Sequence, residues 1–104
     1  MLSVLSALGL QINKVTGNSM LPVIPANSYI LFYTQFRHHK LKVGDIVRVN
    51  HPHYGNIIKQ IYQIEQNHSA FWLQGMNSES VSSQQMGLIS PELISARVLW
   101  IVRP

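Results

Sequence analysis

The sequence contains no cysteine and few charged residues. The lack of cysteine excludes a disulfide framework, a thiol nucleophile and a cysteine-ligated metal. Charged residues make up 12% of the chain and hydrophobic residues 46%, which is the composition of a chain that buries a core and not of a disordered tail. The 104 residues suffice for one domain, residues 1–104, and not for two.

Acidic residues are scarce as well. Four Asp and Glu stand against eight Lys and Arg, so the formal net charge is +4. Part of the excess lies in residues 37–42, RHHKLK. A solvated basic turn explains this segment, although contact with anionic lipid or an acidic partner would also use it. No aromatic-and-basic strand pattern or zinc spacing accompanies it, so we expect no nucleic-acid binding.

The chain also lacks a long apolar run. It begins MLSVLSALGL, which is about half the roughly 20 residues that a membrane-spanning helix needs. No basic residue precedes this stretch, so it is a poor secretory signal. We therefore expect a chain without a transmembrane anchor, either cytoplasmic or peripheral to the membrane, with peripheral membrane contact left open.

Short apolar stretches separated by turn residues predict an all-β fold, a small and mostly antiparallel sheet or barrel. In residues 8–13, apolar and polar residues alternate as in a strand. The other expected strands are residues 28–33, 46–49, 57–65, 70–73 and 97–102. Residues 75–87, GMNSESVSSQQMG, are small and polar, which is typical of a functional loop.

Ser19 lies in a stretch that a regular strand or helix cannot cross, VTGNSMLPVIP at residues 15–25. Gly17 lets another chain approach the backbone closely. Pro22 and Pro25 fix φ and remove amide donors. The stretch predicts a stiff, irregular turn that presents the hydroxyl of Ser19, although a plain surface loop has the same composition.

Lys59 occupies an unusual place for a lysine. Its same-side neighbours on an expected strand are Ile57 and Ile61, and no other charged residue lies between Arg48 and Glu65. One interpretation is an edge strand whose lysine extends its amine to water. The other is a buried lysine, whose pKa burial would lower. A neutral amine can act as a general base and activate a serine, so Ser19 and Lys59 suffice for acyl transfer.

The order of short motifs resembles the type I signal peptidase family. Residues 17–22, GNSMLP, resemble its G-x-S-M-x-P box, and residues 44–47, GDIV, its G-D-x-V box. Residues 58–61, IKQI, resemble the segment that carries the base, and residues 75–87 a degraded last box. In that last box Met76 and Ser82 replace the usual aspartates. The short chain is most similar to compact members such as nickel-type superoxide dismutase maturation proteases.

The resemblance implies a serine endopeptidase that cleaves a leader or pro-segment from a protein or peptide substrate through an acyl-enzyme. Ser19 would be the nucleophile and Lys59 the general base, without any metal or cofactor. Supporting roles would fall to Ser80, which orients the lysine, and to the backbone around Gly17 and Ser19, which stabilises the oxyanion. The implied substrate-binding residues are Val15, Thr16 and Met20.

Two other interpretations remain open. A self-cleaving repressor-type domain shares the fold and the Ser/Lys pair, but its scissile bond lies well upstream of the serine, and the 18 residues before Ser19 contain no Ala-Gly pair. A non-catalytic β module with a degraded site would make Ser19 an ordinary loop residue.

Pairs of histidines, His38-His39 and His51-x-His53, are expected in loops and not as metal ligands, because no cysteine or paired carboxylate accompanies them.

Overall fold

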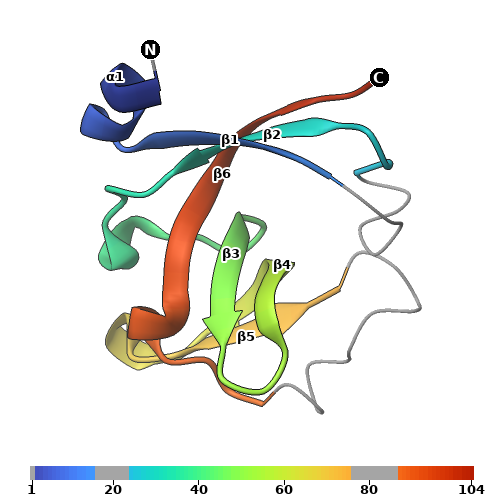
Figure 1. Ribbon diagram of the computed structural model, residues 1–104. Coiled ribbons are helices and arrows are strands. Elements are labelled where there is room, and N and C mark those ends of the chain that lie inside the picture. The colour runs from blue at the N-terminus through green and yellow to red at the C-terminus, as the bar shows by residue number, and fades with distance from the viewer. Residues whose placement is uncertain (1, 16–23, 76–86) are drawn as a thin grey trace.

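One antiparallel sheet of six strands dominates the computed structural model, which describes residues 2–15, 24–75 and 87–104. The strands are β1 Leu10–Lys14, β2 Tyr29–Tyr33, β3 Ile46–His51, β4 Gly55–Ile64, β5 Phe71–Gln74 and β6 Ile94–Val102. Their order in the sheet is β1-β2-β6-β3-β4-β5, so β1 and β5 form its edges (Figure 1). The predicted all-β class is confirmed, and within the described residues the sheet is open and not closed into a barrel.

Short helical segments precede β1 and lie between some of the later strands. They are α1 Leu2–Ala7 and the 3-10 turns η1 His38–Lys40, η2 Gln66–His68 and η3 Pro91–Leu93. Each expected strand is present, with ends that differ from the expected ones by at most three residues. Among the described segments, no helix has the length and apolar character needed to span a membrane.

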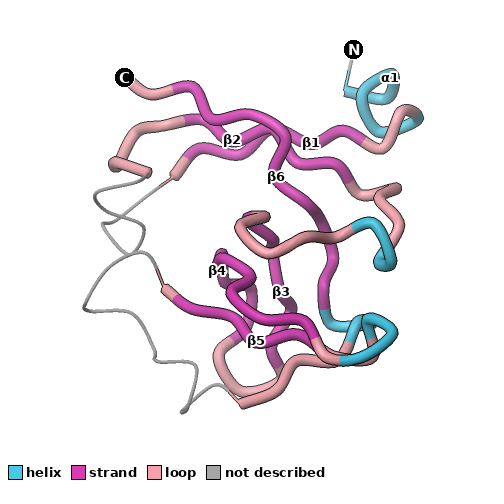
Figure 2. The backbone as a smooth tube through the Cα atoms, turned by 180° about the vertical axis from the view of Figure 1, so that it is seen from behind, coloured by secondary structure: helices cyan, strands magenta, loops and turns pink. Residues whose placement is uncertain are grey.

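The long strand β6 joins the two halves of the sheet. Its first residues, from Ile94 to Arg97, pair with β3, whereas the stretch from Arg97 to Val102 pairs with β2. Figures 1 and 2 show β1 and β2 at the upper end of the molecule, β3 to β5 at the lower end, and β6 running through both. The sheet therefore folds over itself and encloses apolar side chains in each half.

Two apolar clusters form the core. Alternate strand residues point to the same face, so the buried residues of a strand stand two apart, as Val47 and Val49 do. The lower cluster contains Leu41, Val47, Val49, Ile61, Phe71, Leu73, Ile89 and Ile94. The upper cluster contains Val15, Ile24, Ile30, Phe32 and Ala96, with Ile46, Ile58, Val98 and Ile101 packed against it.

Gly9 ends α1 with a backbone conformation that other residues avoid. Its φ is +78°, and its amide donates to the Ser6 carbonyl at 2.9 Å. The Gly9 carbonyl accepts from the Thr34 amide at 2.7 Å and from the Thr34 hydroxyl at 3.1 Å. A Cβ at this position would lie 2.6 Å from Cγ of Gln35. Gly9 therefore lets the chain turn from the helix into β1.

We expect Gly9→Ala to lower the free energy of unfolding by roughly 2 kcal/mol or more, because an L-residue costs about 1–2 kcal/mol at positive φ and the new Cβ would in addition displace the Gln35 side chain. Chemical denaturation measures the change. Gly55→Ala is the matched control, since Gly55 has a φ of +74° but open space around its Cα. The Gly55 variant should lose less stability, and an equal loss would mean that the approach to Gln35 costs nothing.

Candidate active site

Lys59 lies in the interior of the sheet and its side chain is buried. It pairs with Val47 of β3, while the next residue, Gln60, pairs with Gln74 of β5. Only 5% of the Lys59 surface is exposed. Strand β4 is not an edge strand, so the interpretation of Lys59 as an edge lysine that reaches water is wrong.

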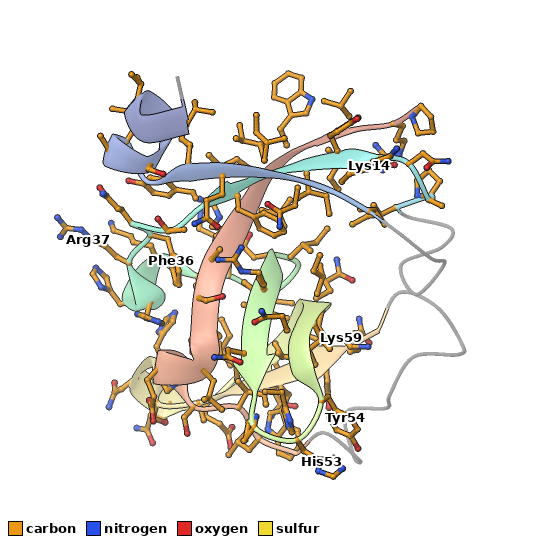
Figure 3. All side chains as sticks on the ribbon, viewed as in Figure 1. Lys14, Phe36, Arg37, His53, Tyr54 and Lys59 are labelled. Atoms are coloured by element: carbon orange, nitrogen blue, oxygen red, sulfur yellow. The ribbon has the colours of Figure 1, made fainter. Side chains whose placement is uncertain are left out.

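The surroundings of Lys59 favour the neutral amine. Its cross-strand partner Val47 and its same-side neighbour Ile61 are both buried. Burial lowers the pKa of Lys59, because the charged form loses its hydration. Among the described residues, no carboxylate forms an ion pair with this amine; the described pair is Asp45 with Arg97, at 3.6 Å. Figure 3 shows Lys59 on β4, directed away from β6.

The residues Gly44 and Asp45 hold this part of β4 in register. The Gly44 amide donates to the Ile61 carbonyl at 2.8 Å, and the Ile61 amide donates to the Asp45 carbonyl at 2.9 Å. The Asp45 carboxylate also accepts from the Lys42 amide at 2.9 Å. These bonds join the chain before β3 to β4 two residues after Lys59, so the Gly-Asp motif positions the lysine strand.

Both ends of the segment that carries Ser19 are anchored in the upper cluster. Val15 is 8% exposed and Ile24 is fully buried. The Val15 amide donates to the Ser28 carbonyl at 2.8 Å, and its carbonyl accepts from the Asn27 amide at 3.0 Å. Ile58, the residue before Lys59, packs against the same cluster. The residues flanking the serine segment are therefore fixed beside the lysine strand.

The backbone of β1 offers hydrogen-bonding groups at the open edge of the sheet. Gly9 and Val15 both bond to the chain that forms β2, at Thr34 and Ser28. In an antiparallel pair, inward and outward groups alternate along the strand, so the even residues between them face outward. Ile12 and Lys14 thus present amides and carbonyls to the open edge, whereas the polar backbone groups of Val15 are used internally.

Most of the predicted site lies outside the described residues. This holds for the nucleophile and its neighbours, Thr16, Gly17, Ser19 and Met20, and for Ser80 in the loop. Strand β5, which precedes the residue 75–87 segment, ends at Gln74. Gln74 pairs with Gln60, the residue after Lys59, so the end of β5 lies next to the lysine. Of the predicted site residues, Lys59 and Val15 are thus the two that the structure locates.

Two of the described histidines, His51 and His68, make hydrogen bonds that hold the chain locally. His51 Nδ1 accepts hydrogen bonds from the amides of His53 at 3.0 Å and Tyr54 at 3.2 Å, which closes the turn between β3 and β4. His68 Nε2 donates to the Leu41 carbonyl at 3.0 Å. Across residues 2–15, 24–75 and 87–104, no group of three or more His, Asp or Glu side chains could hold a metal ion.

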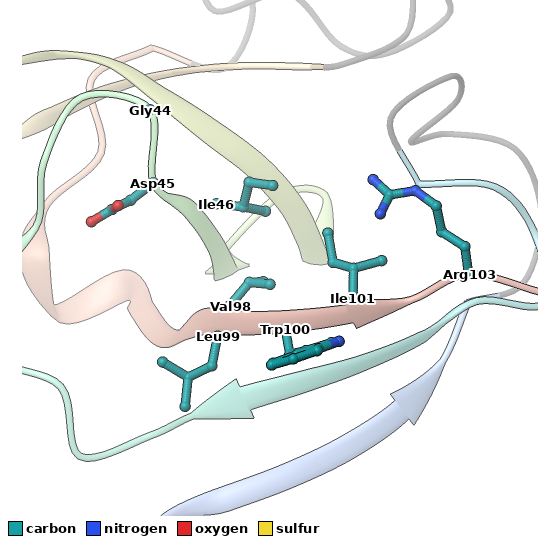
Figure 4. A pocket seen from close by; sticks show the side chains of 8 residues that line it. All are labelled: Gly44, Asp45, Ile46, Val98, Leu99, Trp100, Ile101 and Arg103. Atoms are coloured by element: carbon teal, nitrogen blue, oxygen red, sulfur yellow. The ribbon is translucent and has the colours of Figure 1, made fainter.

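A hollow of about 410 Å³ lies between the start of β3 and the second half of β6. Gly44, Asp45 and Ile46 line one side, and residues 98–101 with Arg103 line the other (Figure 4). Neither Lys59 nor Val15 belongs to its lining. The hollow therefore includes neither of the predicted site residues that the structure describes.

Comparison with known protein families gives a match over most of the chain. A family model described as Peptidase S24-like matches residues 6–90, a span that includes Ser19, Lys59 and Ser80. The chain belongs to the S24-like peptidase family. No curated protein matches it. Membership of the S24-like family confirms the broad class of signal-peptidase-like and self-cleaving repressor-type proteins, but not a specific similarity to nickel-type superoxide dismutase maturation proteases.

Sequence reasoning missed two features of this S24-like domain. The first is that the backbone groups of Ile12 and Lys14 face the open edge of the sheet. This depends on which residues of β1 bond to β2, and the sequence alone does not determine that. Arg48 was given no role, yet its Nε donates to Ser95 Oγ and its Nη1 to Gln11 Oε1, both at 2.9 Å. These partners lie far away in sequence, so no local signal could have revealed them.

Proposed function

We propose that this S24-like protein is a serine endopeptidase that uses a Ser19/Lys59 dyad to cleave a leader or pro-segment from a protein substrate. The observation that carries the proposal is the burial of Lys59, with its lowered pKa, in the interior of a peptidase-family sheet. A lysine with a lowered pKa is neutral in a larger fraction of molecules near neutral pH. Such an amine can serve as the base that a serine nucleophile needs.

In the proposed reaction, Oγ of Ser19 attacks the substrate carbonyl while Nζ of Lys59 takes the hydroxyl proton. The tetrahedral intermediate then breaks its C–N bond, and Lys59 returns the proton to the leaving amine. Water attacks the resulting ester with Lys59 again as base, which releases the acid product and restores Ser19. Backbone amides at Ser19 and Gly17, with the Thr16 hydroxyl, are proposed to stabilise the oxyanion, and Ser80 to orient the Lys59 amine.

The substrate is proposed to bind as an added strand at the open edge of β1. Main-chain bonds of such an added strand supply affinity with little dependence on sequence. The outward groups of Ile12 and Lys14 would make these bonds and lead the substrate toward Ser19. Because the polar backbone groups of Val15 are used internally, we assign the side chains of Thr16 and Met20, and not the Val15 backbone, to contacts near the cleaved bond.

A β-lactam probe tests the proposed nucleophile, because β-lactams acylate serines that a lysine activates. We expect one covalent adduct on the peptide that contains Ser19, measured by mass spectrometry after digestion, and none in Ser19→Ala. Labelling should become faster as pH rises and Lys59 loses its proton. An adduct at another serine, or equal labelling of wild type and Ser19→Ala, would refute the assignment.

A second candidate is self-cleavage, which the family match also favours. In this case the scissile bond belongs to the same chain as Ser19. Incubation of the purified protein at alkaline pH would then give a shorter product at a rate independent of protein concentration. Ser19→Ala would give no product. An intact chain that still acylates with the probe would favour cleavage of a separate substrate.

A further inference from the structure

The upper half of the sheet has an apolar face that no described element covers. The cross-strand register places Ile12, Leu31 and Trp100 in one row, with Tyr29 between Lys14 and Val102 in the next. We define the outer face by these side chains: Ile12, Lys14, Tyr29, Leu31, Trp100 and Val102. Its apolar members line a shallow hollow of about 420 Å³. The opposite face of the same strands carries Ile30 and Phe32, which are buried in the upper cluster.

The outer face is exposed across all three strands. Trp100 is 66% exposed, and Ile12 and Val102 are each 55% exposed. Figure 4 shows Leu99 and Trp100 on the side of β6 away from Ile46, whereas Val98 and Ile101 point toward it. Single exposed apolar residues are ordinary, but a contiguous apolar group marks a surface that meets a partner or a membrane.

Helix α1 adds exposed apolar side chains at the same end of the molecule. It packs beside β1 at the upper end of the molecule, away from β3 to β5, in both Figure 1 and Figure 2. Val4 of the helix is 61% exposed, and Leu8, just after it, is 58% exposed. Residues 1–10 contain no charged side chain, so the helix adds apolar area without any acidic group.

The distribution of charge favours anionic lipid as the occupant. Strands β1, β2 and β6 contain no acidic residue, and Lys14 lies at the rim of the outer face. Of the described acids, Asp45 faces Arg97, whereas Glu65 and Glu92 belong to the η2 and η3 region at the opposite end (Figure 1). A second copy seated on the outer face would offer Lys14 no acidic partner from these strands, whereas an anionic surface complements the lysine.

We propose that the outer face docks the protein peripherally on a bilayer that contains anionic lipid. Trp and Tyr side chains favour the boundary between lipid headgroups and acyl chains, because their rings are apolar and their N–H or O–H groups remain hydrated. Aliphatic side chains enter the boundary beside them, and Lys14 meets lipid phosphates. The docking goes beyond the peptidase proposal and does not depend on Ser19 or Lys59.

Vesicle binding of the full chain tests this proposal. In a Trp72→Phe background, Trp100 is the remaining tryptophan and reports directly on the outer face. We expect flotation with vesicles of equal phosphatidylglycerol and phosphatidylcholine, together with a blue shift of Trp100 emission. Ile12→Glu should weaken binding about tenfold or more, because it places a charge among the apolar anchors. Lys14→Gln should weaken binding to anionic vesicles roughly fivefold and leave binding to pure phosphatidylcholine unchanged.

Val43→Glu is the matched control, since Val43 is 61% exposed in the loop before β3 and lies off the outer face. It should bind vesicles as the wild type does. Circular dichroism checks the fold of each variant, and Trp100→Ser provides a second change on the outer face. Equal flotation of wild type and Ile12→Glu would overturn the proposal. Absence of binding, with a concentration-dependent dimer that Ile12→Glu abolishes, would instead assign the outer face to a second copy and overturn it too.

Discussion

Replacement of Lys59 by alanine is expected to lower the rate of Ser19 acylation by at least roughly 10⁴-fold, the scale of losses when one member of a serine-base unit is removed. The reason is that a serine hydroxyl near neutral pH attacks a carbonyl poorly until a base takes its proton. Stopped-flow or timed mass measurements with the β-lactam probe give the rate, and cleavage of an alanine-rich peptide library gives a second readout.

Lys42→Ala is the control for this substitution. Lys42 is exposed and precedes β3, and its side chain is removed without disturbing its backbone bond to Asp45. Its acylation rate should match that of the wild type. The Lys59→Ala fold is checked by circular dichroism, because truncation of a buried side chain leaves a cavity that lowers stability. A folded Lys59→Ala protein with undiminished acylation would contradict the role of Lys59 as base.

Local chemistry was enough to predict the strands. Residues 8–13 alternate between apolar and polar, and residues 28–33 are rich in β-branched and aromatic side chains. Each of these patterns favours a strand by itself, without knowledge of the rest of the fold. Gly44, which has a positive φ, comes just before the expected strand that begins at Ile46. The six expected strands match, in chain order, the six strands of the part of the chain that the structure describes, although β3 and β4 extend to His51 and from Gly55, so the turn between them is shorter than the expected gap at residues 50–56.

The direction of the apolar faces was harder to predict. Alternation places Leu8, Leu10 and Ile12 on one side, but it does not say whether that side meets the core. In the structure Leu8 and Ile12 are exposed, and the buried residue nearby is Val15. Which side of β1 is buried depends on how the rest of the sheet folds. That in turn depends on the pairing of β2 with β6, which is distant in sequence.

The position of Lys59 could be predicted in part. Its place between two isoleucines suggested either burial or an edge, and the two differ only in whether a strand pairs on each side. Pairing of β4 with both β3 and β5 settles the question in favour of burial. The distance from Lys59 to Ser19 involves a residue outside the described ones, so the dyad itself stays a prediction.

Substitution of Lys59 by methionine is expected to stabilise the protein by on the order of 1–3 kcal/mol at neutral pH, since methionine fills similar space without an amine to desolvate. For a domain of this size, each kcal/mol corresponds to an increase in Tm of roughly 4–8 °C. Natural active sites commonly carry a stability cost of this kind. Thermal or urea unfolding of the two proteins measures the difference.

The pH dependence separates loss of an amine from a simple packing effect. Burial makes the pKa of Lys59 lower in the folded state than in the unfolded state, so between these two values the unfolded chain binds more protons. Wild-type stability therefore rises with pH across that window, and the advantage of Lys59→Met shrinks as pH approaches the ordinary lysine pKa. Lys42→Met, at an exposed site, should change stability by less than about 0.5 kcal/mol at every pH. A constant advantage of Lys59→Met at all pH values would mean that the Lys59 amine ionises alike in both states, and Lys59 could then not serve as the neutral base.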